Sequence, residues 1–425
     1  LPLSLGSLVN LETFIISNNN LTGTLPSEIS SLTKLQYFSV GSNRLNGDVP
    51  TNISAWVDIT SLDLSNNDFT GPLDFLVSFP QLSIVTLYGN SFSGNIPSLM
   101  GLNKLLVFEV YGNELSGNLT SPFVNSTAFY YMDVSDNELS GEIPDDIYLL
   151  PVLTTVNLSK NKFTGSVKRF SSGLLTFLDL SDNLFTGNLV QLFRYAGAAV
   201  HVDVSSNLFT GLIPDDLGFL STAKSCNISH NQIYGTVPTA VNSLNSLIEF
   251  SLSYNQLQQD LNVALNRLNV TGILRDIELD HNQFSGTVPE DIEYFGRFVQ
   301  SLDISYNVLT GDLPSVDIPF HIDISGNYFN CPFPSSWSNS TEVTCTANCC
   351  EQVQNSSNEN DYSSKGDDYS SEGDDGSNNS GNSLKWLWIT IGVIVGLVIL
   401  IIIVVGGVFG YKRYKEKHAP YVAVE

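Results

Sequence analysis

Apolar residues recur along this chain at regular positions, alternate with polar residues, and are followed by a fixed Asn and Gly. Residues 175–189 show the whole pattern, L-x-x-L-x-L-x-x-N-x-L-x-G-x-L, with Phe185 in one Leu position. A period this regular is typical of a repeat protein. The pattern returns mostly every 23 or 24 residues, and its Asn stands at fourteen positions: Asn19, Asn43, Asn67, Asn90, Asn113, Asn137, Asn161, Asn183, Asn207, Asn231, Asn255, Asn282, Asn307 and Asn327.

Each position of the repeat predicts a local structure. Leu178 and Leu180 alternate with polar residues, which indicates a short strand with one apolar face. One such strand cannot bury its face alone, but stacked copies form a continuous core. We expect Asn183 to turn inward and to bind main-chain groups that the bend leaves unpaired. Gly187 permits the tight turn that follows.

Many copies continue with Ile, Leu or Val, then Pro, then carboxylates, as in Pro144-Asp-Asp and Pro214-Asp-Asp. Pro suits the first position of a helix, and carboxylates suit its positive end. Each coil is therefore predicted as a strand, a turn and a helical or irregular return. Two features depart from this. Thr120, Lys168 and Val190 stand where Pro is usual, and the 27-residue spacing from Asn255 to Asn282 predicts a bulge or longer loop.

The consensus N-x-L-x-G-x-I-P, at about 24 residues, resembles the plant-type leucine-rich repeats of receptor-like proteins and receptor kinases. The resemblance covers residues 1 to about 334. It implies an α/β solenoid, a curved right-handed superhelix whose concave side carries a parallel sheet and is used for binding.

The repeats are expected to fill residues 1–330. The chain starts in the second half of a repeat, without the signal peptide or N-terminal cap usual in the family, so we expect an N-terminally truncated fragment. Residues 331–350 are predicted to form a disulfide-stapled C-terminal cap. The resemblance implies a Cys331–Cys345 pair, but Cys349 and Cys350 are also present, and four cysteines allow three pairings. Cys226, in a Leu position, is expected to be a buried free thiol.

Three further segments are predicted after the cap. Residues 351–385 are rich in Ser, Asn and Asp, which indicates a disordered acidic stalk. Residues 386–411 carry no charge and are long enough for one transmembrane helix. The short tail, 412–425, is basic, so the positive-inside rule places the repeats outside the cell in a type I plasma-membrane protein. The bilayer is thus one expected partner.

Charge and sequons agree with an extracellular place. The net charge of −25 argues against nucleic acid as a partner, because that partner requires a basic face. Asn-x-Ser/Thr sequons are expected glycosylation sites of secreted chains. There are ten of them, at Asn20, Asn52, Asn118, Asn125, Asn157, Asn227, Asn269, Asn339, Asn355 and Asn378.

No catalytic motif stands out in the sequence. The five His residues lie in non-equivalent contexts without metal-ligand spacing, no Gly-x-Ser-x-Gly elbow occurs, and the carboxylates follow the repeat. We therefore expect neither an enzyme nor a cofactor or metal.

A ligand would bind side chains that flank the inward strand positions, because these point to the concave face. The middle outward position of the strands is mostly acidic, from Asp63 to Asp323. Two groups of residues depart from that background. An aromatic and acidic patch on three successive strands is the first candidate: Ile84, Tyr88, Val107, Glu109, Tyr111, Tyr131 and Asp133. A column just before the repeat Asn is the second: His230, Tyr254, His281 and Tyr306.

The resemblance implies a cell-surface receptor-like protein that binds an extracellular peptide, protein or glycan and signals through a partner (co-receptor) kinase. One alternative is a receptor kinase whose C-terminal half is missing, which coding sequence beyond Glu425 would reveal. Another is an adhesion or surface-coat glycoprotein that transmits no signal.

Overall fold

The computed structural model describes residues 1–119, 126–194, 196–268, 273–295, 298–338 and 342–345, within a compact unit that runs from Leu1 to Glu359. The predicted stalk, membrane span and tail lie outside these residues, as do Cys349, Cys350 and five sequons (Asn125, Asn269, Asn339, Asn355 and Asn378). Within the described part of the chain, no helix is long and apolar enough to cross a bilayer.

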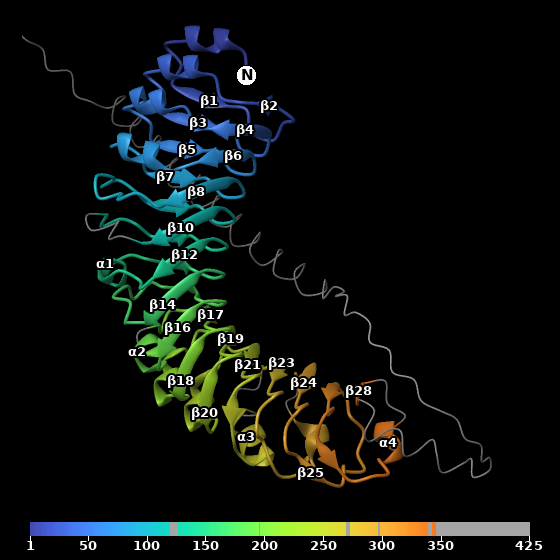
Figure 1. Ribbon diagram of the computed structural model, residues 1–425. Coiled ribbons are helices and arrows are strands. Elements are labelled where there is room, and N and C mark those ends of the chain that lie inside the picture. The colour runs from blue at the N-terminus through green and yellow to red at the C-terminus, as the bar shows by residue number, and fades with distance from the viewer. Residues whose placement is uncertain (120–125, 195, 269–272, 296–297, 339–341, 346–425) are drawn as a thin grey trace, which may run out of the picture. The chain divides into compact units, whose positions relative to one another are not determined.

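The main feature is a parallel sheet of fifteen strands in sequence order, one strand from each coil. In Figure 1 its later strands lie on the inner side of the bend, and helices of the return segments lie on the outer side. Its strands are β1 (Thr13–Ile15), β3 (Tyr37–Ser39), β5 (Ser61–Asp63), β7 (Ile84–Thr86), β9 (Val107–Glu109), β11 (Tyr131–Asp133), β13 (Thr155–Asn157), β15 (Phe177–Asp179), β17 (His201–Asp203), β19 (Ser225–Asn227), β21 (Glu249–Ser251), β23 (Asp276–Glu278), β24 (Ser301–Asp303), β26 (His321–Asp323) and β28 (Val343–Thr344).

A second parallel sheet forms after the repeat Asn, around the Gly position. The sequence pattern did not predict it. Its eleven strands are β2 (Thr22–Gly23), β4 (Arg44–Asp48), β6 (Asp68–Gly71), β8 (Ser91–Asn95), β10 (Glu114–Asn118), β12 (Glu138–Gly141), β14 (Lys162–Ser166), β16 (Leu184–Gly187), β18 (Leu208–Leu212), β20 (Gln232–Gly235) and β22 (Gln256–Leu257). The strands β25 (Thr310–Gly311) and β27 (Tyr328–Phe329) pair separately.

The return segments contain short helices, and more than half of them begin directly after a Pro, as the pattern predicts. They are η1 (Leu3–Ser7), η2 (Ser27–Ser31), η3 (Thr51–Ala55), η4 (Asp74–Ser78), α1 (Asp145–Leu149), α2 (Val190–Phe193), η5 (Asp215–Phe219), η6 (Thr239–Ser243), α3 (Leu261–Leu268), η8 (Ile292–Tyr294) and α4 (Ser335–Ser338). Apolar residues of the strands and returns meet in one continuous core between the two sides of each coil.

The repeat Asn has the inward role that the sequence predicts. The amide nitrogen of Asn183 donates to the carbonyls of Leu158 (2.9 Å), Leu180 (3.2 Å) and Ser181 (3.0 Å). Its Oδ1 accepts the N–H of Phe163 at 2.9 Å. The side chain is 6% exposed. One amide thus satisfies main-chain groups of two adjacent coils, which is why the position recurs.

The 27-residue spacing holds a helix, which the prediction of a bulge or longer loop did not include. The return segment there contains α3, whose Leu261, Ala264, Leu265 and Leu268 are buried. Their spacing of three and four residues is that of a helix face packed on a core. Residues inserted in a return segment reduce stability least, because they leave the pairing of the sheet strands unchanged.

The long sheet continues beyond the fourteen predicted repeats. Strand β28 lies in the segment predicted as the C-terminal cap, and its Thr344 pairs with Asp323 of β26. Cys331 is exposed and Cys345 is half-buried, and a disulfide between them stays a prediction. Cys226 is 1% exposed and free, which confirms its expected role as a small apolar core residue.

Candidate ligand-binding surface

The strands of the long sheet align their outward residues in rows. The sheet register confirms the predicted middle row, which runs through these fourteen positions: Ile15, Ser39, Asp63, Thr86, Glu109, Asp133, Asn157, Asp179, Asp203, Asn227, Ser251, Glu278, Asp303 and Asp323.

Many of the carboxylates in this row have a structural task. The carboxylate of Asp179 accepts the N–H of Ser181 at 2.9 Å and its hydroxyl at 2.7 Å. Asp203 binds Ser205 in the same way, at 2.9 Å and 2.6 Å. In each pair the Asp carboxylate accepts the backbone N–H of the residue two positions later, which stabilises the bend that follows the strand. Acidity of the row is therefore not by itself a sign of a ligand.

The first candidate patch breaks this arrangement. Ser usually occupies the outward position after the middle row, but Tyr88 and Tyr111 occupy it in two adjacent coils. Their rings are stacked, with centroids 4.4 Å apart and planes 4° apart. Gly89 and Gly112 follow them at positive φ (65° and 63°). A Cβ on Gly89 would lie 2.6 Å from Oδ1 of Asn66, so a side chain there would crowd the neighbouring coil.

Glu109 lies beside the tyrosine pair, in the middle row. Thr86 and Tyr131 hydrogen-bond to its carboxylate, and both bonds favour the charged form. Burial nevertheless raises its pKa to about 7, with further contributions from the nearby Asp133 and Asp63. Burial also raises the pKa of Tyr131 and Tyr111, so both phenols stay neutral donors. The patch thus presents aromatic rings around a carboxyl that is partly protonated near neutral pH.

Two predicted members of this patch are less available than expected. Val107 is 9% exposed and Asp133 is 8% exposed. The carboxylate of Asp133 is occupied, because it accepts from Ser135 N–H (3.0 Å), Ser135 Oγ (2.6 Å) and Asn157 Nδ2 (3.1 Å). The half-buried part of the patch consists of Ile84, Tyr88, Glu109, Tyr111 and Tyr131.

The second candidate column forms a continuous stack of rings. Centroids lie 4.0 Å apart for His230–Tyr254, 3.9 Å for Tyr254–His281 and 4.3 Å for His281–Tyr306. The ring of Tyr306 lies over Gly326, where an added Cβ would be 2.6 Å from it. The four rings cover one another's faces, so the column offers a ligand mainly ring edges.

A third group was not among the residues that the sequence singled out. Phe177 and His201 stack in the first outward position of β15 and β17, with centroids 4.6 Å apart. Beside them, burial and the charge of Asp179 raise the pKa of Asp203 to about 7, and burial lowers the pKa of His201. The sequence does carry a sign of this group, because two adjacent repeats have an aromatic ring at the same strand position. Among the described residues, no group of His, Cys, Asp and Glu is arranged to hold a metal ion.

The concave sequons are engaged in hydrogen bonds. Nδ2 of Asn157 donates to Asp133, and Nδ2 of Asn227 donates to Asp203, both at 3.1 Å. A glycan attached to either nitrogen would have to replace that bond. Asn20, Asn52 and Asn118 are exposed. Nδ2 of Asn52 also donates, to the carbonyl of Ser27 (2.9 Å) and Oγ of Ser30 (3.0 Å), so Asn20 and Asn118 fit glycosylation better. Use of any sequon stays a prediction.

Comparison with known proteins agrees with the repeat assignment. Residues 10–32 match the family model described as Leucine Rich Repeat. Receptor-like protein 48 and receptor-like protein 50 of Arabidopsis thaliana are each 32% identical over 54 residues, 13% of this chain. The matched segment spans only 7% and 6% of those two proteins.

Solved structures share the fold at low sequence identity. The plant peptide hormone receptor RGFR1, in complex with RGF2, superposes with a TM-score of 0.68 at 23% identity, over 81% of this chain and 65% of that one. The Arabidopsis receptor kinase HAESA, in complex with the peptide hormone IDA and the co-receptor SERK1, gives 0.64 at 23% identity, over 81% and 66%. A leucine-rich repeat protein of Leptospira interrogans gives 0.60 at 24% identity, over 78% and 88%. These likenesses establish the solenoid fold.

Proposed function

Taking this chain as a leucine-rich repeat protein similar to plant receptor-like proteins, we propose that its repeats are the ligand-binding part of a cell-surface receptor. The observation that carries the proposal is the stacked pair of Tyr88 and Tyr111 beside Glu109. Tyr88 and Tyr111 replace the Ser that stands after the middle row in most other coils. These two coils therefore lack the bond from a Ser hydroxyl to the Asp two residues earlier, as seen in Ser181 and Ser205. Rigid aromatic side chains on a sheet are favoured anchors for a binding partner.

The proposed ligand is an extracellular peptide. An extended chain offers donors and side chains at a spacing that several strands can read, and Glu109 would accept an N–H or a cationic group from it. Two structural neighbours, RGFR1 and HAESA, are bound to peptide hormones, which supports this class. A protein or glycan ligand has no comparable support.

The proposed signalling route goes through a partner kinase. HAESA is bound to the co-receptor SERK1, which supports a partner of this kind. The repeats would then bind ligand outside the cell and carry no catalytic activity of their own.

We predict that Tyr88→Ala with Tyr111→Ala removes peptide binding, because both anchors are lost together. A displayed library of random peptides, selected on the wild-type chain, supplies the binders, and their affinity for the variant is then measured. A loss of about 2 kcal/mol or more is expected. Tyr294→Ala is the matched control, since this tyrosine is 76% exposed and lies on a return segment.

The unfolding transition of the double variant should shift by no more than about 1 to 2 kcal/mol, because the two rings pack mainly on each other outside the core. Unchanged peptide binding would refute the patch. Binding that survives in cells without any recruited kinase would favour the adhesion alternative.

A further inference from the structure

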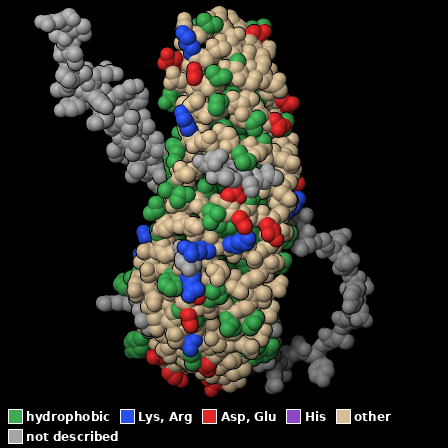
Figure 2. Space-filling model, turned by 90° about the vertical axis from the view of Figure 1, so that its left-hand side faces the viewer, with side chains coloured by type: hydrophobic (Ala, Val, Ile, Leu, Met, Phe, Trp, Pro, Cys, Tyr) green, Lys and Arg blue, Asp and Glu red, His purple; other side chains and the backbone are tan. Residues whose placement is uncertain are grey.

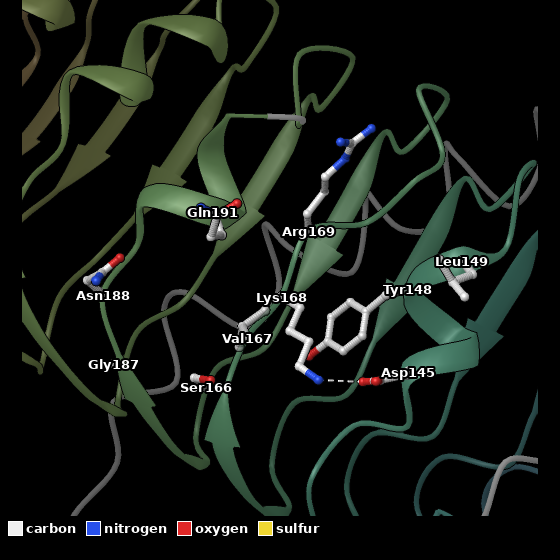
Figure 3. A pocket seen from close by; sticks show the side chains of 10 residues that line it. All are labelled: Asp145, Tyr148, Leu149, Ser166, Val167, Lys168, Arg169, Gly187, Asn188 and Gln191. Atoms are coloured by element: carbon white, nitrogen blue, oxygen red, sulfur yellow. Dashed lines mark hydrogen bonds and ion pairs between the residues drawn. The ribbon is translucent and has the colours of Figure 1, made fainter.

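A hollow of about 550 Å³ opens among the return segments, on the elements that lie away from the long sheet. Its walls are α1, the segment 166–169 and the start of α2 (Figure 3). The polar side chains that line it include Asp145, Ser166, Lys168, Asn188 and Gln191. This volume lies within the range of small-molecule sites.

The hollow has a cause in the sequence. The coil between Asn161 and Asn183 spans 22 residues and has Lys168 in place of the usual Pro. All its residues are described, and none of them is helical between β14 and β15. The coils on either side carry α1 and α2 in their returns. The row of return helices is therefore interrupted at this coil.

The lining of the hollow carries two cationic side chains, Lys168 and Arg169, and one carboxylate, Asp145, in a chain whose net charge is −25. In Figure 2, blue side chains gather at mid-height on the face that carries the return segments, with carboxylates beside them.

Lys168 supplies the positive charge at the mouth of the hollow. Its Nζ lies 2.6 Å from Oδ1 of Asp145, and the two side chains are 54% and 74% exposed. In Figure 3 the Arg169 side chain extends away from Lys168. Tyr148 is hydrogen-bonded to the main chain of Lys168 and is 4% exposed. It fixes the base of the lysine and leaves the ammonium free to hold Asp145 and a second anion together, since Lys has three donors.

We propose that this hollow binds an acidic sugar, a pyranose ring that bears a carboxylate. Lys168 takes the carboxylate. The amides of Asn188 and Gln191 and the hydroxyl of Ser166 each both donate and accept, which is what ring hydroxyls require. A bare carboxylate would not use the amides, and a neutral sugar would not use the lysine. The site is separate from the concave patch and does not depend on a peptide ligand.

The test uses the full chain with three probes: glucuronate, glucose and N-acetylglutamate. Binding is measured by calorimetry or by ligand-observed NMR at low ionic strength. Glucuronate should bind, and the other two probes should bind at least about tenfold more weakly, because each lacks one half of the recognised chemistry. Equal binding of N-acetylglutamate would overturn the sugar assignment. The expected Kd for glucuronate is ~1 mM. No binding at a glucuronate concentration about 20-fold above that Kd would overturn the site.

Three variants show that the bound site is this one. Lys168→Gln should weaken glucuronate binding about tenfold. Asp145→Asn should strengthen it severalfold, because it removes the competing carboxylate, and misfolding cannot produce a gain. Lys162→Gln should leave glucuronate binding unchanged. Lys162 lies in the same coil as Lys168 and forms a similarly exposed ion pair (3.3 Å), with Glu138 of the preceding coil, but it lies outside the hollow. An equal loss in the two lysine variants would mean attraction to general positive charge and would refute the site.

Discussion

Asn183→Ala is expected to destabilise its coil by about 3 kcal/mol or more. The change removes three donated hydrogen bonds and one accepted bond, at 2.9 to 3.2 Å. It leaves the N–H of Phe163 without a partner, which costs about 1 to 3 kcal/mol. The carbonyls of Leu158, Leu180 and Ser181 each keep one other donor, from Asn161, Asn207 and Lys160, so each of those three lost bonds costs only about 0.5 to 1.5 kcal/mol. Denaturant unfolding followed by hydrogen exchange measures the effect, with the fastest exchange expected in β14, β15 and β16.

A repeat Asn at the first coil gives a matched control. Asn19 is exposed and donates only to the carbonyls of Ile16 and Ser17, both at 3.0 Å. Water can take over both carbonyls after Asn19→Ala, so less than about 1 kcal/mol should be lost. Equal losses at the two positions would mean that the inward amide is not what stabilises the coil. Because contacts in a solenoid join neighbouring repeats, exchange far from Asn183 should change little.

The protein is expected to be more stable at about pH 5 than at pH 8. Burial raises the pKa of Glu109 from 4.5 to about 7, of Asp133 from 3.8 to about 6, and of Asp203 from 3.8 to about 7. A carboxyl whose pKa is raised by folding binds more protons in the folded state, so stability falls as pH rises from the unfolded to the folded pKa. The window is therefore about pH 4 to 7. Between pH 5 and these folded pKa values lie roughly five pKa units in total, so a difference of up to about 7 kcal/mol is expected.

His201 acts in the opposite direction at the acidic end. Burial lowers its pKa from 6.5, so the unfolded state binds its proton more readily and stability falls as pH drops below 6.5. One histidine opposes three carboxyls, so it makes the decline with pH shallower below pH 6.5 but does not reverse it. Thermal unfolding from pH 4 to 9 measures the curve.

Glu109→Gln is the diagnostic variant for this curve. It keeps the shape of the side chain and removes the carboxyl of the tyrosine patch whose pKa is raised most. The decline in stability between pH 5 and pH 8 should therefore become shallower. Asp312→Asn, outside the long sheet, serves as the control and should leave the curve as it is. A wild-type protein whose stability rises from pH 5 to pH 8 would contradict the assigned directions of the three pKa shifts.

Sequence alone determined the repeat, the inward Asn and the outward rows. The row from Ile15 to Asp323 follows from the repeat alone, because each strand pairs only with the same strand of the next copy. In a solenoid, period in the sequence becomes position in space, and a residue's neighbours are about one repeat away. The stacks of Tyr88 with Tyr111 and of His230 with Tyr254 follow from the same rule.

Tertiary structure decided what depends on the size and course of neighbouring segments. The pattern shows that Asp133 points outward, but only the packing of Tyr131, Ser135 and Asn157 around it makes it buried. The raised pKa of Glu109 has the same origin, since desolvation depends on everything that surrounds a group. The hollow beside Lys168 exists because a return segment without a helix lies between α1 and α2. Such gaps and burial arise from differences between adjacent coils, which a consensus averages away.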